Sequence, residues 1–185
     1  MLIAQEKRKS NIAEYVLYMW QVEDLIRAYH FKMDLIEAHI ISQFKQPEKI
    51  RQEIRNWYAN IIVMMHEEGI RDKGHLGIVK GIVSQMNDLH IRLLHQNNDG
   101  QYLNYYNQAK INIDDLKSKL PDSNINDIET CFDGLYGLLL LRLKGMEINQ
   151  ETETAMQTFS NLLAMLALRF KQIEEGEQFP AKNSH

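Results

Sequence analysis

Apolar residues recur near the start of the chain at alternating intervals of three and four. The series has nine members: Ile12, Tyr15, Met19, Val22, Ile26, Tyr29, Met33, Ile36 and Ile40. This spacing is the a/d pattern of a heptad repeat, which places the side chains along one side of a helix. We therefore predict a helix from about residue 11 to residue 44, with Ser10 as its N-cap. Such a helix would be about 50 Å long and would pack against other helices.

Five further helices are predicted, over about residues 47–68, 75–95, 101–119, 123–144 and 150–175. Pro47 suits the first position of a helix, and Gly69, Gly145 and Gly176 stand where left-handed residues end helices. The link before Pro47 is short, so the first two helices should form an antiparallel hairpin. The middle of 101–119 is β-branched and polar, which leaves open whether it is one helix or two.

These elements predict an all-α fold. We expect a single-domain bundle of about six helices over residues 1–176, with a long N-terminal helix, followed by a disordered tail at 177–185. The chain shows no alternating strand pattern, no internal repeat and no long linker. Gly134 and Gly137 lie inside a predicted helix, where they indicate either close helix packing or a cavity.

Composition and charge make several classes of protein improbable. The net charge of −4 argues against nucleic-acid binding, which needs a basic footprint. The longest strongly apolar stretch, residues 135–141, is far shorter than the roughly 20 residues of a membrane span. The single cysteine, Cys131, lies in an apolar helical run and is predicted to be buried. We therefore expect a cytoplasmic protein without membrane or nucleic-acid partners.

Sequence motifs of common enzymes are missing. No glutamate has a histidine three residues on, and no His-Glu-x-x-His, phosphate-binding glycine loop or Gly-x-Ser-x-Gly element occurs. His90 stands at the edge of an apolar helix face, where a boundary histidine is more common than a catalytic base. Nothing in the sequence assigns a catalytic residue, and no cofactor is predicted.

One candidate polar site lies beside the heptad seam of the first predicted helix. Glu23, His30 and Glu37 recur every seventh residue, with Asp34 close to the same strip. These side chains form either a ligand-binding strip or a row of ion pairs that fixes the register of a neighbouring helix. Seven residues rise about 10.5 Å, so only His30 and Asp34, one turn apart, could chelate one ion from a single helix.

A second candidate site is the segment from His66 to His75. It concentrates His66, Glu67, Asp72 and His75, which are residue types that bind metal ions, within ten positions. Two glutamates before Gly69 oppose the helix dipole, and a bound cation would remove that cost. However, Glu174-Glu175-Gly176 ends another helix in the same way, so the pattern is equally consistent with an ordinary helix end.

The run NIAEYVLYMWQVEDLIRA, residues 11–28, carries a family resemblance. It resembles an uncharacterised family of small bacterial proteins, mostly from the Bacteroidetes, known as a domain of unknown function. The resemblance implies a bacterial helical protein over nearly the whole chain. It implies no activity, substrate or catalytic residue.

Two functions remain open from the sequence. The first is a non-enzymatic protein that acts by protein–protein association, as a homodimer or with another protein. Its candidate interface residues are Tyr15, Met19, Val22, Ile26, Tyr29, Tyr105 and Tyr106. The alternative is a helical bundle, either a binding protein or an enzyme, that binds a small molecule or a metal ion in an interhelical pocket.

Overall fold

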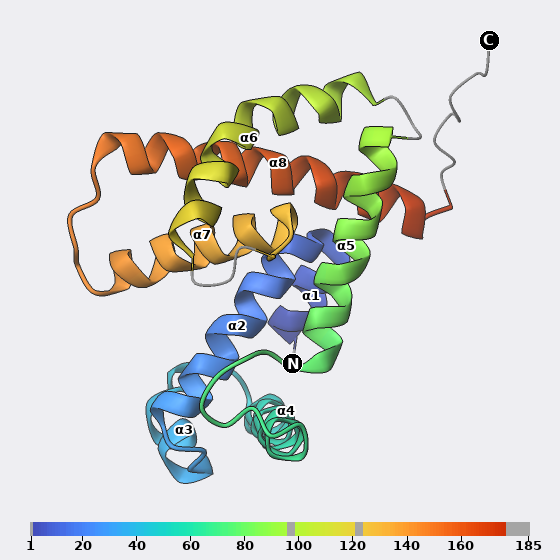
Figure 1. The fold of residues 1–185 in the computed structure, drawn as a ribbon. Helices are drawn as coiled ribbons and strands as arrows, with labels where there is room; N and C mark the ends of the chain where they lie inside the picture. Colours follow the sequence, from blue (N-terminus) through green and yellow to red (C-terminus); the bar gives the residue numbers. More distant parts are fainter. Residues whose placement is uncertain (1, 96–98, 121–123, 177–185) are drawn as a thin grey trace. The chain divides into compact units, whose positions relative to one another are not determined.

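The chain is all-α, as the sequence predicts. The computed structural model describes residues 2–95, 99–120 and 124–176, and these ranges contain eight α-helices, one 3-10 helix and no strand (Figure 1). The elements are α1 (Leu2–Ser10), α2 (Ile12–Ala28), α3 (Met33–His39), η1 (Ile41–Gln43), α4 (Glu48–Glu67), α5 (Gly77–His95), α6 (Gly100–Lys119), α7 (Asp127–Leu143) and α8 (Gln150–Glu174). The predicted tail, 177–185, and the predicted helix start at Ser123 lie outside the described residues.

Contacts along the chain define two compact units. The first holds α1 up to Lys9 together with residues 14–81, and the second holds residues 10–13 with the chain from Ile82 onward. In the first unit, α4 packs against α3 and η1. In the second unit, α8 packs against both α6 and α7, which also contact each other (Figure 1). The expectation of one domain over residues 1–176 stays a prediction.

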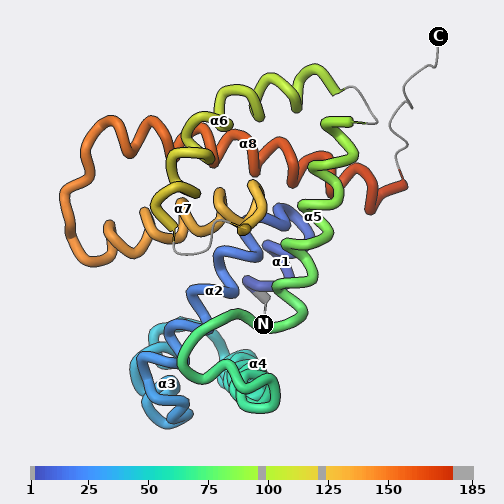
Figure 2. Tube along the Cα trace, viewed as in Figure 1, coloured from blue at the N-terminus to red at the C-terminus, as the bar shows by residue number. Residues whose placement is uncertain are grey.

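The prediction of one helix over residues 11–44 is wrong. The helix α2 ends at Ala28, the chain turns, and a new helix, α3, begins at Met33 (Figure 2). The turn is a Schellman motif: Phe31 N donates to Ile26 O at 3.0 Å and His30 N donates to Arg27 O at 2.8 Å. His30 and Phe31 have φ angles of 54° and 60°. Among the described residues they are the only ones other than glycine in this left-handed region.

The reason the sequence misled at this turn is the residue type. Helices usually end in this motif with glycine, since a side chain at positive φ costs free energy. Histidine tolerates the conformation better than most residues but is a weak signal for it. Phe31 supplies part of the compensation, because its ring lies 4.7 Å from that of His66 on α4. The heptad pattern continues through the turn although the helix does not.

The start of the chain also differs from the prediction. Residues 2–10 form α1 rather than a segment before the first helix. Ser10 is the last residue of α1, and Asn11 instead caps α2, since its Oδ1 accepts from Ala13 N at 3.0 Å.

The later helix boundaries agree closely with the prediction. Gly69, Gly145 and Gly176 have φ angles of 68°, 66° and 86°, which confirms the three predicted glycine ends. Pro47 is the N-cap of α4 rather than its first residue. The segment 100–119 is one continuous helix, which settles the question that the sequence left open.

The second unit has a tightly packed centre. An added Cβ at Gly134 on α7 would lie 2.8 Å from Phe159 Cε2 on α8 and 3.0 Å from Leu116 Cδ2 on α6. This confirms the reading of Gly134 as a close approach of helices. At one end of the unit, Asp99 caps α6 and pairs with Arg169 of α8 at 2.7 Å.

Candidate functional site

A buried carboxylate on α2 holds the loop between α4 and α5. Glu23 has 0 % of its surface exposed. Its Oε1 accepts from Leu76 N at 3.0 Å, and its Oε2 lies 2.6 Å from His75 Nδ1. A carboxylate can only accept hydrogen bonds, so Nδ1 of His75 carries the hydrogen. Glu23 thereby satisfies a backbone N–H at the start of α5 and fixes the histidine tautomer.

The tautomer gives His75 a defined chemistry. In a neutral imidazole with its hydrogen on Nδ1, the other nitrogen, Nε2, keeps the lone pair that a base or a metal ligand needs. The side chain of His75 is 28 % exposed. The Trp20 ring stacks on the imidazole, with ring centroids 4.1 Å apart and planes 10° from parallel. The carboxylate and the indole together hold the imidazole in one orientation.

Arg27, one helical turn after Glu23, holds the same loop through its backbone. Its guanidinium donates to Ile70 O at 3.1 Å, to Gly74 O at 2.5 Å and to Asp24 at 2.8 Å. The face of α2 therefore fixes the loop through Trp20, Glu23 and Arg27. A purely architectural role accounts for all of these contacts, and the same arrangement would also present His75 to a ligand.

The structure does not bring the four predicted polar residues together. Glu23 is buried against the α4–α5 loop, whereas His30 is exposed in the turn after α2. Asp34 is exposed on α3, and Glu37 pairs with Arg55 of α4 at 2.9 Å. Because the turn separates His30 from α3, His30 and Asp34 do not lie one turn apart on a single helix.

The predicted metal ligands are likewise separated. His66 Nδ1 accepts from Arg71 Nε at 2.6 Å, and His75 pairs with Glu23. Glu67 and Asp72 are exposed. In the described part of the chain, no three His, Cys, Asp or Glu residues lie close enough to hold an ion. The sequence missed the Glu23–His75 pair because its members are 52 positions apart.

Most of the predicted interface seam lies inside the chain. Met19, Val22 and Ile26 are buried, whereas Tyr15 and Tyr29 are partly exposed. On α6, the predicted interface residues Tyr105 and Tyr106 are also partly exposed. Tyr106 Oη donates a hydrogen bond to Asp127 Oδ2 of α7 at 2.8 Å.

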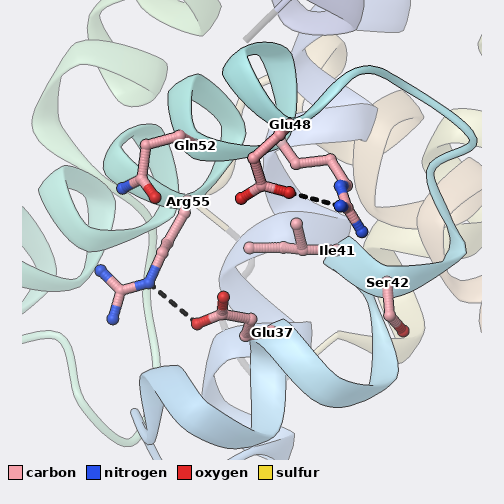
Figure 3. Close-up of a pocket in the computed structure, with 7 residues that line it drawn as sticks. Glu37, Ile41, Ser42, Glu48, Gln52 and Arg55 are labelled. Carbon is pink, nitrogen blue, oxygen red and sulfur yellow. Dashed lines mark hydrogen bonds and ion pairs between the residues drawn. The ribbon is translucent and has the colours of Figure 1, made fainter.

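Each of the two units has a hollow that is lined only by its own residues. Between α3, η1 and α4 lies a small polar pocket of about 110 Å³. Figure 3 shows Glu37, Gln52 and Arg55 around it, with Ile41 between the helices. A larger groove of about 360 Å³ lies between α5 and α8. Its lining combines apolar Leu89, Phe170 and Ile173 with polar Gln85, Asp88, Arg92 and Glu174.

Several polar side chains of the second unit are buried or partly buried. His90 is buried, and its Nδ1 lies 2.6 Å from Tyr102 Oη. Burial lowers the pKa of His90 to about 4, although the nearby Asp127 opposes this shift, so the imidazole is neutral at neutral pH. Lys117 Nζ lies 2.5 Å from Asp127 Oδ1.

Cys131 is buried as predicted, and burial raises the pKa of its thiol.

A family model for the domain of unknown function DUF4924 matches residues 1–177. The chain belongs to this DUF4924 family. The match bears out the resemblance of the opening run to an uncharacterised family. No curated protein and no solved structure matches the chain.

Because DUF4924 is a domain of unknown function, membership of this family assigns no ligand or catalytic residue to the hollows and ion pairs described above. Within the described residues, no helix is both long and apolar enough to cross a bilayer.

Proposed function

We propose that this protein acts without catalysis, by association with a second copy of its own chain. The observation that carries the proposal is a group of exposed apolar side chains within six positions at the end of α7: Leu141, Leu143 and Met146. Leu143 has 72 % of its surface exposed. Large apolar side chains that are exposed within a short stretch at the end of a helix are candidates for a surface that a partner covers.

The charges around this surface favour a copy of the chain as the partner. Basic Arg142 and Lys144 and acidic Glu147, Glu151 and Glu153 all lie between positions 142 and 153, and all five are exposed. In a twofold dimer the same surface faces itself, so the basic residues of one copy can meet the acidic residues of the other. The Arg142–Glu153 pair, 3.3 Å long and exposed, costs little to exchange for such contacts.

The seam of α2 is a weaker surface for association than the sequence indicates, because Met19, Val22 and Ile26 are already buried. Tyr15, Tyr29 and Tyr105 are partly exposed and remain candidates for contacts with a partner.

The test is the molar mass in solution. Light scattering after size-exclusion chromatography at micromolar concentrations should give a dimer for the natural chain and a monomer for Leu143→Glu. Ile111→Glu is the matched control, since Ile111 lies on α6 of the same unit and is 75 % exposed. A monomeric natural chain would refute the proposal, as would equal dissociation by both variants.

A second candidate function is the binding of a small molecule, which the groove between α5 and α8 supports. A volume of about 360 Å³ falls within the usual range of ligand pockets, and the mixed lining suits an amphipathic molecule. A ligand screen by thermal unfolding should find stabilising compounds whose effect is lost in Ile173→Asp, a change at a partly exposed residue of the lining. A ligand that stabilises this variant equally does not bind in the groove.

We also propose a bacterial, cytoplasmic setting. The resemblance of residues 11–28 to bacterial proteins supports the source, and a buried single cysteine suits a reducing compartment. Fractionation of cells that express the natural gene, with blotting for the protein, tests this placement.

A further inference from the structure

The groove between α5 and α8 has an apolar floor. Leu89 of α5 and Phe170 of α8 are 2 % and 8 % exposed, and Ile173 of α8 is partly exposed. Figure 1 shows the last turns of α8, which carry Phe170 and Ile173, crossing α5. The floor can therefore bury the apolar part of a small ligand, and this burial is a main source of affinity in such sites.

Charged side chains of both signs stand at the rim of this groove. Asp88 and Arg92 lie four positions apart on α5, and Glu174 lies on α8. All three are exposed. Side chains four positions apart share one face of a helix, with Cβ atoms about 5–6 Å apart. A carboxylate and a guanidinium are thus neighbours beside the apolar floor.

Asp88 and Arg92 are both available to a ligand. In the part of the chain that the structure describes, neither side chain has a hydrogen bond or an ion pair, with each other or with any other residue. An ion pair between exposed side chains at this spacing is weak in any case, because water competes for both charges. A ligand that binds both residues therefore breaks no strong contact within the protein.

This arrangement of charges discriminates between the head groups of ligands. A single positive charge is attracted by Asp88 and Glu174 but repelled by Arg92, and a single negative charge meets the reverse. A head group that carries both charges close together is attracted by both sides. An α-amino acid has such a head group, since its ammonium and carboxylate groups are bonded to one carbon atom.

We infer that this groove binds an α-amino acid with an apolar side chain. The ammonium group faces Asp88 and Glu174, and the carboxylate accepts from the guanidinium of Arg92, whose planar fork matches two carboxylate oxygens. The apolar side chain lies on Leu89 and Phe170. The volume of about 360 Å³ is near the lower end of the roughly 300–1,000 Å³ of ligand pockets, which suits a small ligand. The inference rests on the second candidate function above, ligand binding in this groove.

The test is a titration of the full chain, followed by amide NMR shifts at neutral pH and constant ionic strength. The three probes share one apolar body and differ in charge. Phenylalanine carries both charges, phenylethylamine carries only the ammonium, and phenylpropionate carries only the carboxylate. Phenylalanine should bind about fivefold more tightly than either of the others, because it gains one attraction and offsets one repulsion.

Single changes at the rim should separate the probes. Asp88→Asn should weaken the binding of phenylalanine and phenylethylamine by about fivefold, and phenylpropionate should bind as before or more tightly. Arg92→Gln should weaken phenylalanine and phenylpropionate by about as much, and phenylethylamine should bind as before or more tightly. Asp115→Asn is the matched control, since it removes the same charge from an exposed residue of α6 that pairs with Lys119. It should bind all three probes as the natural chain does.

The opposite preferences of the two rim variants separate binding from folding, since a misfolded variant loses all three probes together. The inference is overturned if phenylalanine gives no saturable shift at about 20 mM or binds no more tightly than the other probes. It is also overturned if the rim variants show no opposite preferences. Equal binding of the three probes that is lost in Ile173→Asp would overturn the inference but keep the groove as a ligand site. Probes that bind Ile173→Asp as they bind the natural chain would refute the groove as a ligand site, and the second candidate function with it.

Discussion

Replacing His30 by glycine should stabilise the folded protein, because the turn after α2 holds this residue at a φ of 54°. A residue with a side chain costs about 1–2 kcal/mol in the left-handed region, and glycine does not. Glycine also gives the unfolded chain more freedom, which offsets about 0.4–1 kcal/mol of that gain. His30 is exposed, so little packing is lost. The expected net gain is about 0.5–1 kcal/mol.

Equilibrium unfolding in urea, followed by far-ultraviolet circular dichroism, measures this gain as a shift in midpoint at unchanged slope. Ala28→Gly is the control, since Ala28 is also exposed but lies in the last turn of α2 with helical geometry. It should destabilise the protein by about 0.5–1 kcal/mol. If His30→Gly instead destabilises the protein as Ala28→Gly does, position 30 is helical. The long helix that the heptad pattern predicts would then be the true structure.

Gly134→Ala should destabilise the protein by about 1–3 kcal/mol through overpacking. Gly137→Ala meets open space and should stabilise it by up to about 1 kcal/mol, both measured by urea unfolding. By the same assay, Glu23→Gln should cost about 1–3 kcal/mol, because the amide has one oxygen in place of the two that accept from Leu76 N and His75 Nδ1. The exposed Glu37→Gln should cost about 0–1 kcal/mol. The pKa of His90 is lowered from 6.5 to about 4 in the folded protein, so only the unfolded chain takes up this proton between those values. Stability should therefore fall from pH 6.5 to pH 4, by about 3 kcal/mol at most, and His90→Gln should flatten this dependence.

Each of these predictions has an outcome that contradicts it. Equal effects of alanine at positions 134 and 137 would mean that the α7–α8 approach is looser than the structure has it. If Glu23→Gln is no less stable than Glu37→Gln, the carboxylate of Glu23 does not hold the α4–α5 loop by hydrogen bonds. An unchanged pH profile in His90→Gln would assign the loss to other groups. Asp99 and Asp127 have lowered pKa values, so their protonation reduces the free energy of unfolding only near pH 3.8 and below.

The helix boundaries show which features of the fold depend on residues that are close together in the sequence. Gly69, Gly145 and Gly176 end their helices as predicted, since glycine adopts positive φ without cost and this preference can be read from one position. His30 ends α2 by the same hydrogen bonds without that signal. The contact of Phe31 with His66 helps to hold this turn, and a contact between segments 35 positions apart is not visible in a periodic pattern.

The candidate site shows the same division. Glu23 and His75 were both singled out from the sequence, but in two different groups with other partners. The chain brings Glu23 to His75 and leaves His30, Asp34, His66 and Asp72 elsewhere, because α2 and the α4–α5 loop meet only after folding. Asp88 and Arg92 were not singled out, although their spacing of one helical turn on a predicted helix was a readable signal.

The sequence by itself determined that this protein is all-α and where most of its helices begin and end, because hydrophobic periodicity and capping residues act over a few positions. The tertiary structure alone decided that the first long helical pattern is broken at His30. It also decided that Glu23 is buried beside His75, and that Asp88 and Arg92 of α5 share a groove with Phe170 of α8. The physical reason is that burial, left-handed backbone and ion pairing at these places depend on groups supplied by distant segments of the chain.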